Sequence, residues 1–573
     1  MKSLLGLTAI TAFLTQTSLA APPLARRQNS TDWTAQEWDV IVVGAGTAGI
    51  IVADRLSEAG KKTMLLELGG PSYGIVGGTE RPSWLDGTGL SRVDVPGLYK
   101  SIFSTPDSEL LCPADVVSAF QACTIGGNSA INAGLYFQPP ASDWDNYFPA
   151  GWKSADVEEA TQRLLAKQPS VTSYSVDGKY YLQSGYDAAE EWLVKGAGFS
   201  HVSFNEEPNN KDRVFGRPVY NYIDGQRGGP TRTYLQSALK RSNFRLQTGV
   251  QVQRINHVGG VASSITAKVD GSIITVPLSR AGRVIVSAGA IASPGLLIHS
   301  GIGPSETLAK LSAAGFISNS NSSAWVANPA VGEGLFDNPN TYIELTGSTI
   351  ESYAHSYDDP ITADKDLYLS SRSGPYAFAS QTSAFWGYVD NDDGSRTGVQ
   401  GTIDSSGYAD FTDNKTITLN IYGTSGLKSS GRVILSSEGK FIPGPSSDVY
   451  YNDPQDGMSI AKFIHTIFQA LPASTPDSPA VAGLTPLNIA QNSTVEEIYT
   501  YITTWSKYAV GSVQHWSSSC RIGKCVDADT KVIGTMNIHV IDASIVSPLT
   551  VNPQFGVMVA AEKGSERVLK TWG

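Results

Sequence analysis

The strongest hydrophobic pattern in the chain lies near its beginning. Val40–Val43 is an unbroken apolar run, which is typical of a strand buried on both faces. The next segment has apolar residues at helical spacing and stops at Gly60. A second apolar run, Thr63–Leu66, ends directly before Glu67. The pattern therefore predicts a strand, a helix and a second strand in close succession.

The turn between the first strand and the helix carries a nucleotide-binding motif. Gly44, Gly46 and Gly49 form the sequence GxGxxG. In such a motif the first glycine makes a tight turn, the second lets the backbone approach a pyrophosphate, and the third lets the helix pack closely. The positive N-terminus of the helix faces the phosphates, and Glu67 can accept hydrogen bonds from an adenosine ribose. This unit predicts dinucleotide binding, but it does not distinguish NAD from FAD.

The hydrophobic pattern of three later segments favours FAD. Residues 123–139 form a glycine turn that leads into small and polar residues. Residues 282–304 have the pattern of a strand, a small-residue turn and an apolar helix start, and residues 537–569 that of a strand, a loop and a final helix. A permanently bound flavin needs contacts from such distant parts of a chain. Strand-like runs at 415–424 and 430–437 predict a sheet elsewhere.

Composition and charge narrow the classes of function. Hydrophobic residues make up 41% and charged residues 17% of the 573 residues, with 57 Gly and 30 Pro, which is typical of a loop-rich globular enzyme. A chain of this length is too long for one compact core and favours two closely joined domains. The net charge of -11, without a Lys/Arg-rich stretch, argues against a nucleic-acid partner.

The N-terminus predicts secretion. Residues 1–20 combine a positively charged start, an apolar stretch and small residues up to Ala20, which is the pattern of a signal peptide. Residues 21–36 would form a linker or propeptide, in which Arg26-Arg27 is either a dibasic processing site or part of an ordinary linker. The apolar stretch is too short to cross a bilayer, so we expect a secreted, extracellular protein without a membrane partner.

The expected secretion favours disulfides between the cysteines and glycosylation at the sequons. Four cysteines allow three pairings, and Cys112 with Cys123 and Cys520 with Cys525 are the local choices for disulfides in an oxidising compartment. A metal site built from all four is the alternative, but neither pair has CxxC spacing and we expect no metal. Sequons predict glycosylation, where exposed, at Asn29, Asn321, Asn414 and Asn492.

Several segments together resemble the glucose–methanol–choline (GMC) family of flavoprotein oxidoreductases. GAGTAG with Glu67 matches its nucleotide fingerprint, GGNSAIN resembles its first signature, and GAIASPGLLIHSGIG fits its second. VGEGLFDNP and SSGRVIL resemble further family stretches, so the likeness covers nearly the whole mature chain. The sequence is most similar to the flavin dehydrogenase domain of fungal cellobiose dehydrogenase, without its haem domain, in GIIVADRLSEAGKKTMLLELGGPS, NNKDRVFG and GPTRTYLQSAL.

The resemblance implies an α/β fold with two interleaved domains and no clean linker. An FAD-binding, Rossmann-like domain would comprise residues 37–138, 210–315 and 525–573. Residues 139–209 and 316–524 would form an α+β substrate-binding domain built on an antiparallel sheet.

The resemblance also implies an active site. His515, in QHWSS, falls on the position of the family's catalytic base, and Asn552, in VNPQ, on that of its partner. A histidine suits this role because its pKa lies near working pH. Asn552 would hold the substrate hydroxyl and orient it toward His515, and only the fold can bring the two together. The implied cofactor contacts are Gly44, Gly46, Thr47, Ala48, Gly49, Glu67, Asn128, Asn132, Val252, Asp542, Ala543 and Gln554.

Val513, Gln514 and Trp386 are the expected substrate contacts. Val513 and Gln514 precede the base directly, where cellobiose dehydrogenases carry a Ser-Asn pair whose Asn contacts the sugar. A site built to bind sugar hydroxyls loses affinity when such groups are replaced, which disfavours cellobiose itself. Trp386, or Phe385 beside it, lies in a strand-like alternation and would either face a sugar or be buried in a core.

We therefore expect a secreted FAD-dependent oxidoreductase that oxidises a CH–OH group, with the hydride going to flavin N5 and the proton to His515. Nothing marks covalent attachment, so FAD should be bound non-covalently. The favoured substrate is a sugar or oligosaccharide hemiacetal, oxidised to the lactone. The alternatives are a primary, aryl or secondary-metabolite alcohol, or a hydroxynitrile-lyase-like protein with structural FAD. The electron acceptor, such as a quinone, oxygen or a redox protein, stays open, as does the choice between dehydrogenase and oxidase.

Overall fold

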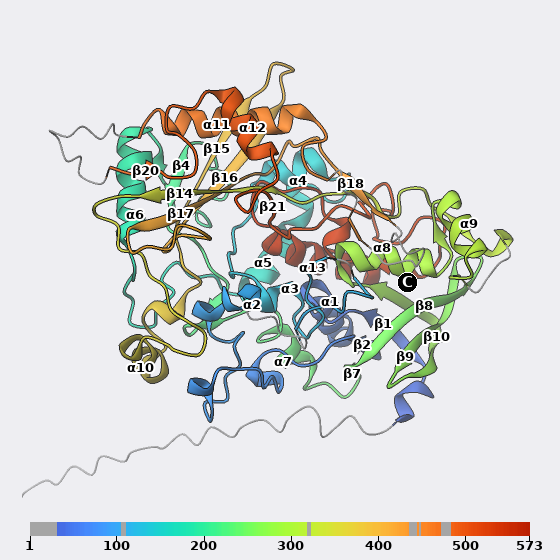
Figure 1. Ribbon diagram of the computed structural model, residues 1–573. Helices are drawn as coiled ribbons and strands as arrows, with labels where there is room; N and C mark the ends of the chain where they lie inside the picture. Colours follow the sequence, from blue (N-terminus) through green and yellow to red (C-terminus); the bar gives the residue numbers. More distant parts are fainter. Residues whose placement is uncertain are drawn as a thin grey trace, which may run out of the picture.

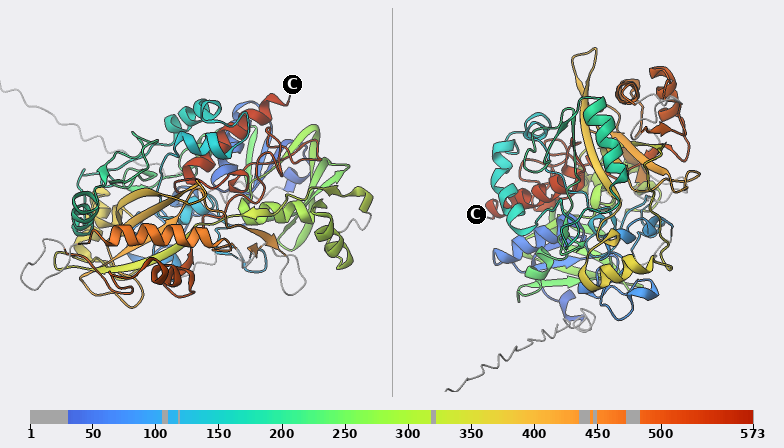
Figure 2. Two further views of the ribbon diagram at one scale, coloured as in Figure 1. Left: turned by 90° about the horizontal axis from the view of Figure 1, so that it is seen from above. Right: turned by 90° about the vertical axis from the view of Figure 1, so that its left-hand side faces the viewer.

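The computed structural model describes residues 31–104, 110–117, 119–317, 322–434, 444–445, 449–471 and 483–572. The predicted signal peptide and the sequons at Asn29 and Asn321 lie outside these residues. Two large sheets lie side by side, and the C-terminal helix α13 (Gln554–Lys570) runs along their junction (Figures 1 and 2). The predicted fold class is confirmed: one sheet is mostly parallel with packed helices, and the other is mostly antiparallel.

The first sheet is seven-stranded and contains the predicted strand–helix–strand unit. Its order is β7-β2-β1-β10-β9-β8, and β22 pairs with β10. The central strands are parallel, and β1 is buried as its apolar run predicted, while β8, β9 and the first part of β10 form an antiparallel meander. The strands are β1 Trp38–Val43, β2 Thr63–Leu66, β7 Phe244–Gln247, β8 Val250–Val258, β9 Val261–Val269, β10 Ser272–Val286 and β22 Ile538–Val540.

Helices pack around this sheet and bring distant segments together. Helix α1 begins within the glycine motif, at Thr47, and packs against α13, α7 and β2. Helix α8 follows β10, as the pattern of residues 282–304 predicted. These helices, with those around them, are α1 Thr47–Glu58, α3 Asn128–Ile131, α4 Ala141–Tyr147, α5 Ser154–Lys167, α7 Tyr234–Ala238, α8 Gly289–His299 and α9 Ser305–Ala313.

A buried carboxylate on α13 connects four of these helices. Glu562 is 1% exposed and accepts hydrogen bonds from Arg163 Nε at 3.1 Å and from the Tyr234 hydroxyl at 2.8 Å. Arg55 Nε lies 3.1 Å from the same carboxylate. Because the partners stand on α5, α7 and α1, one negative charge on α13 fixes the position of all three.

The second sheet is eight-stranded. Its order is β20-β14-β17-β16-β15-β4-β3, and β21 pairs with β14. The runs predicted as strands at 415–424 and 430–437 correspond to β17, in this sheet, and to β18. The strands are β3 Ser200–His201, β4 Val214–Gly216, β14 Pro339–Thr346, β15 Gln381–Asp390, β16 Arg396–Asp404, β17 Thr416–Gly423, β20 Thr485–Pro486 and β21 Ala509–Ser512.

The two faces of the second sheet differ in character. Leu419 and Ile421 of β17 point to a core that they share with Ile464 of α11 and Ile498 of α12. Their neighbours along the strand, such as Asn420, point to the opposite face because side chains alternate in a strand. The helices beside this sheet are α6 Ser184–Ala189, α10 Thr362–Ser371, α11 Pro454–Phe468 and α12 Val495–Thr503.

Short elements complete the described chain. The remaining helix is α2 Ser101–Ser104, and the remaining strands are β5 Tyr222–Ile223, β6 Gln226–Arg227, β11 Ile302–Gly303, β12 Val326–Ala327, β13 Glu333–Leu335, β18 Gly431–Ile434 and β19 Gly444–Pro445. Strand β4 pairs with β15 of the second sheet, although the predicted FAD-binding segment 210–315 contains it. The predicted domain bounds otherwise stay a prediction.

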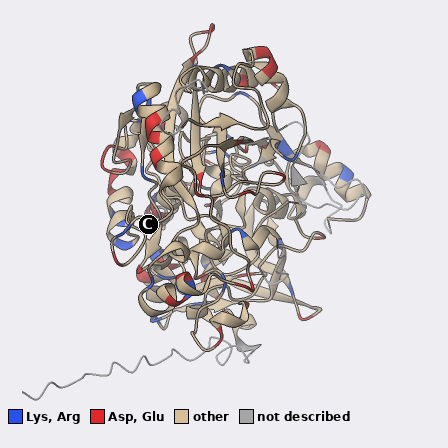
Figure 3. Ribbon diagram, turned by 60° about the vertical axis from the view of Figure 1, so that its left-hand side comes forward, with Lys and Arg blue, Asp and Glu red and all other residues tan. Residues whose placement is uncertain are grey.

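Both predicted disulfides are present. Cys112 is bonded to Cys123, and Cys520 is bonded to Cys525. The first closes a loop directly before α3, and the second closes a short loop after the segment that contains His515. Positions of Lys and Arg and of Asp and Glu are interspersed along the ribbon (Figure 3). In the described part of the chain, no helix is long and apolar enough to span a bilayer.

The Glu562 cluster gives a test of how the helices are held. Glu562→Ala should lower the free energy of unfolding by about 2–4 kcal/mol, because it leaves Arg55 and Arg163 without their buried partner. Glu159→Ala is the matched control: its side chain is 87% exposed, 3.9 Å from Arg163, and its loss should leave stability unchanged. Urea unfolding followed by circular dichroism measures both. Equal midpoints for the two variants would contradict the role given to Glu562.

Candidate active site

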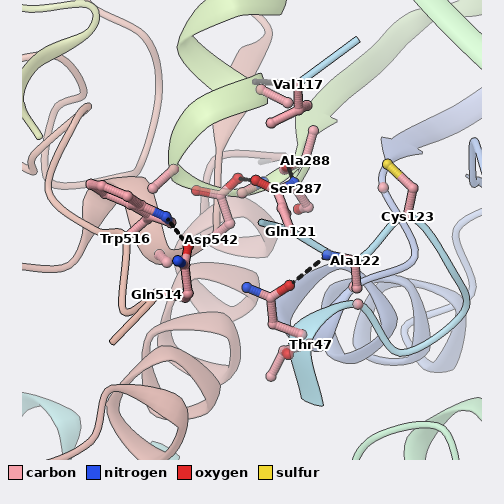
Figure 4. A pocket seen from close by; sticks show the side chains of 18 of the residues that line it. Thr47, Val117, Gln121, Ala122, Cys123, Ser287, Ala288, Gln514, Trp516 and Asp542 are labelled. Atoms are coloured by element: carbon pink, nitrogen blue, oxygen red, sulfur yellow. Dashed lines mark hydrogen bonds between the residues drawn. The ribbon is translucent and has the colours of Figure 1, made fainter. Parts of the chain in front are cut away.

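A cavity of about 820 Å³ lies between the two sheets and contains nearly all the predicted site residues. Its volume is in the range of sites that hold a cofactor together with a substrate. Its lining includes Gly44, Gly46 and Glu67 as well as His515 and Asn552. Figure 4 shows part of its wall, from Thr47 near the nucleotide motif to Gln514 and Trp516.

The glycine motif forms part of the cavity wall. Gly46 is the N-cap of α1, and Gly44, Gly46, Thr47 and Ala48 line the cavity. Gly49 does not line it. A Cβ at Gly49 would lie 1.9 Å from the Gly44 carbonyl oxygen, so this glycine serves helix packing. The structure thus corrects the predicted cofactor contact at Gly49, because the helix backbone there lies against the turn.

A second glycine-rich turn faces the motif. Gly127, which precedes α3, has a φ of +53°. A Cβ at Gly127 would lie 2.7 Å from Gly46 Cα, so the two backbones run in direct contact. Only glycine combines this close approach with a left-handed conformation. The result is a narrow groove whose walls are backbone, which is what a pyrophosphate requires.

Glu67, the predicted ribose contact, lines the cavity and is 6% exposed. Its Oε2 accepts a hydrogen bond from the Ala45 N–H at 2.8 Å, and its Oε1 accepts one from the Gly69 N–H at 3.0 Å. Burial raises the pKa of Glu67 to about 7, against the opposing effect of these backbone donors. Two backbone hydrogen bonds fix the carboxylate, and a carboxylate has further acceptor sites for ribose hydroxyls.

The other predicted cofactor contacts also line the cavity: Asn128, Asn132, Val252, Asp542, Ala543 and Gln554. Asn132 Nδ2 donates to Gln554 Oε1 at 2.6 Å, which joins the second glycine turn to the start of α13. Asn128 Oδ1 accepts from the Ala122 N–H at 2.9 Å (Figure 4). Together with the glycine groove and Glu67, this polar, backbone-rich surface fits FAD.

Asp542 lines the cavity, but both oxygens of its carboxylate accept hydrogen bonds from the protein. Its Oδ2 accepts from the Gly289 N–H at 2.9 Å, and its Oδ1 accepts from the Ser544 N–H at 2.8 Å. Burial raises the pKa of Asp542, and hydrogen bonds from Ser293 and Ser544 oppose this. The carboxylate therefore ties the C-terminal segment to the first residue of α8.

The side-chain amide of Asn338, in the link between β13 and β14, holds His515 in one tautomer. Its Nδ1 lies 2.8 Å from Asn338 Oδ1, and Asn338 Nδ2 donates to the Gly423 carbonyl at 2.7 Å. Because a carbonyl only accepts, the Asn338 amide must turn its oxygen to the imidazole, and Nδ1 must carry the proton. His515 Nε2 is then an acceptor. Loss of hydration lowers the pKa of His515 to about 3, so the ring is neutral.

Asn552 lies opposite this acceptor. Its Nδ2 is 3.4 Å from His515 Nε2 and 3.1 Å from the Tyr422 hydroxyl. Its Oδ1 accepts from Gln400 Nε2 at 2.8 Å, which turns the NH₂ group toward the histidine. The fold therefore brings together the two residues predicted as catalytic, an acceptor on one side and a donor on the other. A hydroxyl group that lies beside the pair, within hydrogen-bond distance of both nitrogens, can donate to His515 and accept from Asn552.

Asp337 is a site residue that the sequence reasoning missed. Its carboxylate accepts from the N–H groups of His515 at 2.7 Å and Gln514 at 3.2 Å, and from the Tyr450 hydroxyl at 2.6 Å. Gln514 has a φ of +65°, a conformation that costs about 1–3 kcal/mol in residues other than glycine. The carboxylate stabilises this backbone. The stretch VGEGLFDNP, noted only as a family likeness, was the signal for Asp337 and Asn338.

The predicted substrate contacts have mixed outcomes. Val513 and Gln514 line the cavity, where Gln514 Oε1 accepts from the Trp516 indole at 2.9 Å (Figure 4). Trp386 is a correction: it is fully buried, away from the cavity, and its indole donates to the Thr550 carbonyl at 2.9 Å. The ring packs edge-on against Phe137 at 4.8 Å, because core side chains from two segments cover that part of β15.

The sheet supplies a group of cavity residues that no motif had marked: Gln381, Thr402, Asn420 and Tyr422. They stand on β15, β16 and β17. The alternation of polar and apolar residues in KTITLNIYGT was the available signal, since it gives β17 one polar face. Among the described residues, no cluster of His, Cys, Asp and Glu is arranged to hold a metal ion.

Known proteins resemble this chain over most of its length. Two models of the GMC oxidoreductase family match it, at residues 38–340 and 428–561. An uncharacterized GMC-type oxidoreductase of Rhodococcus erythropolis is 25% identical over 564 residues, which cover 93% of this chain and 98% of that protein. The (R)-mandelonitrile lyase 1 of Prunus serotina is 25% identical over 533 residues, covering 88% of this chain and 82% of the lyase. A solved formate oxidase of Aspergillus oryzae superposes with a TM-score of 0.73 at 17% identity, covering 94% of this chain and 98% of that one.

These similarities agree with the geometry of the cavity. The formate oxidase shares the fold, and the two family models cover both the nucleotide motif and His515. The cavity joins a dinucleotide groove to a neutral histidine and its amide partner. The chain therefore belongs to the GMC oxidoreductase family, and it is an FAD-dependent oxidoreductase.

Proposed function

We propose that this protein is a secreted oxidoreductase that oxidises the hemiacetal CH–OH group of a sugar or oligosaccharide to the lactone. The observation that carries the proposal is the pairing of His515 Nε2 with Asn552 Nδ2, 3.4 Å apart, in the same cavity as the nucleotide groove. The two groups are complementary to one hydroxyl, which is the group that such a reaction must deprotonate.

The chain's own residues handle the proton of the reaction. FAD, when bound, takes up the hydride that leaves the substrate carbon. His515 Nε2 accepts the hydroxyl proton, and its low pKa means that the acceptor is present without prior deprotonation. Asn552 Nδ2 donates to the hydroxyl oxygen and so holds the O–H bond toward the histidine. Asn338 keeps the proton on Nδ1 and thereby keeps Nε2 available.

The sugar substrate is supported by the likeness to the flavin domain of cellobiose dehydrogenase and by the polar sheet face beside Asn552. Val513, in place of a hydroxyl-bearing residue, favours the alternative of a primary or aryl alcohol. The similarity to a mandelonitrile lyase supports a second class of function, in which His515 acts only as acid and base. The electron acceptor can be oxygen, a quinone or a redox protein.

Secretion is part of the proposal. The two disulfides support an oxidising compartment. Asn414 and Asn492 are exposed, as acceptors of N-linked glycans must be. The signal peptide and the processing site at Arg26-Arg27 lie in the part of the chain that the structure does not describe.

Anaerobic mixing of the purified protein with candidate substrates tests the proposed reaction. We expect glucose or xylose to bleach the flavin absorbance, because hydride transfer reduces the cofactor. Benzyl alcohol and other aryl alcohols serve as the competing panel. Bleaching by alcohols alone would replace the sugar with an alcohol substrate. Absence of bleaching by both panels, together with cleavage of a hydroxynitrile, would replace oxidation by lyase chemistry.

The role of His515 predicts a large loss of rate on substitution. His515→Ala should slow flavin reduction by about 10²–10⁴-fold, the usual contribution of a general base, with the FAD content unchanged. The matched control is His201→Ala on β3, an exposed histidine, which should keep the wild-type rate.

The pH profile of the wild-type enzyme provides the second readout for His515. Since burial lowers the pKa of His515 to about 3, the base stays unprotonated, and kcat/KM should be flat from about pH 5 to 8. An ordinary, hydrated histidine would instead lose activity as the pH falls through about 6.5. A decline at that position would contradict the desolvated base.

The glycine groove predicts a loss of bound cofactor. Gly127→Ala places a Cβ 2.7 Å from Gly46 Cα, so the groove must shift. We expect the ratio of flavin to protein absorbance to fall at least about twofold. Gly178→Ala is the control, because its φ of +74° is also left-handed but its Cβ meets nothing within 4 Å. An equal FAD content in both variants would show that the close approach does not matter for FAD binding.

A further inference from the structure

The polar face of the second sheet is continuous with His515 and Asn552, here called the catalytic pair. Gln400 and Tyr422 are paired across β16 and β17, and both bind Asn552. The next pair on the same face is Thr402 and Asn420, which lines the cavity. The strand register therefore extends a polar surface outward from the catalytic pair by one pair of residues.

Gln381 extends this surface onto β15. It pairs with Asp404, two residues beyond Thr402 on the same face of β16, and it also lines the cavity. Its side chain is 6% exposed. Gln381, Thr402 and Asn420, here called the amide wall, thus form one polar patch contributed by three neighbouring strands.

Two acceptor atoms of the amide wall have no hydrogen-bond donor among the described residues. Gln381 Oε1 and Asn420 Oδ1 are buried, and within the described parts of the chain no donor reaches either of them. Gln400 Oε1, one layer deeper, is in the same state. Buried polar groups in folded proteins are normally hydrogen-bonded, so these two cavity-lining acceptors, Gln381 Oε1 and Asn420 Oδ1, need a donor from outside the described protein. A buried acceptor without a donor costs free energy. A ligand that supplies the donor removes this cost and therefore binds more tightly.

The chemistry of these atoms specifies the kind of ligand. Amide oxygens accept hydrogen bonds, so their complement is a ligand with several hydroxyl donors. An aryl or aliphatic alcohol has one hydroxyl, which the catalytic pair takes, and its apolar remainder would leave the acceptors desolvated and unpaired. A carbohydrate ring carries further hydroxyls beside the reacting one. These can reach acceptors that lie one residue pair away from the catalytic pair.

We propose that the amide wall is the subsite that binds the ring hydroxyls of a carbohydrate substrate through Gln381 Oε1 and Asn420 Oδ1. The inference rests on the proposed function for the location of the reacting hydroxyl. It adds the residues that select for a polyhydroxylated ring. Affinity for the sugar is thereby located on the second sheet, apart from the residues that move the proton.

Calorimetric titration of the holoenzyme tests the subsite without turnover. The probe is 1,5-anhydro-D-glucitol, which lacks the anomeric hydroxyl and cannot be oxidised to a lactone. Tetrahydropyran, the same ring without hydroxyls, is the comparison ligand. Gln381→Met and Asn420→Leu remove the acceptors at similar side-chain volume. Asn420→Asp keeps an acceptor, and Gln162→Met on the exposed face of α5 controls for the Gln-to-Met change.

Each of the two acceptor-removing variants should weaken binding of the anhydroglucitol about tenfold, as expected for one lost hydrogen bond to a desolvated partner. Asn420→Asp and Gln162→Met should bind it as the wild type does, and tetrahydropyran should show no measurable binding. FAD absorbance and the thermal unfolding midpoint identify any variant that misfolds, and the other acceptor then decides. Unchanged affinity in both folded variants, or equal binding of tetrahydropyran, overturns the subsite.

The outcome separates the subsite from the proposed function. Binding that depends on the amide wall, without flavin bleaching by any sugar, supports the subsite and contradicts sugar oxidation. Flavin bleaching by glucose in wild type and both variants, with equal anhydroglucitol affinity, supports the reaction and overturns the subsite.

Discussion

The hydrogen bond between His515 Nδ1 and Asn338 Oδ1 constrains the whole reaction centre. Asn338 cannot reverse its amide, because its Nδ2 already donates to the Gly423 carbonyl. The proton of the neutral ring therefore stays on Nδ1, and the lone pair of Nε2 stays in the cavity. Asp337, the neighbouring residue, fixes the backbone of His515 and of Gln514. Two consecutive residues thus determine the position and the tautomer of one side chain.

A second chain of amides arrives at the same point from the sheet. Gln400 orients Asn552, and Asn552 presents its NH₂ group to His515 and Tyr422. The hydrogen-bond directions follow from one another, so no member can rotate alone. Trp386 supports the same segment, because its indole donates a hydrogen bond to the Thr550 carbonyl, two residues before Asn552. Trp386, predicted as a substrate contact, thus supports the loop that carries Asn552.

The site also depends on the join between the two sheets. Asn552 lies two residues before α13, whose Glu562 is bound by side chains of α1, α5 and α7. Helix α1 in turn begins at the glycine motif. The nucleotide groove and the contact between His515 and Asn552 are therefore placed by the same helix packing. The second sheet faces this arrangement with its polar side and buries its apolar side under α11 and α12.

The sequence by itself determined the elements whose signals are local. An apolar run with a glycine motif gave β1, α1, β2 and Glu67, because periodicity and turn chemistry act over a few residues. Cysteines close in sequence identified both disulfides. His515 and Asn552 were found only through the family likeness, since their spacing alone carries no chemistry. Tertiary structure decided the rest. The alternating sequence predicts that Trp386 lies in a strand, but only the packing shows that Phe137 covers its ring. Gln381, Thr402 and Asn420 lie far apart in the chain, and only strand register places their side chains on one wall.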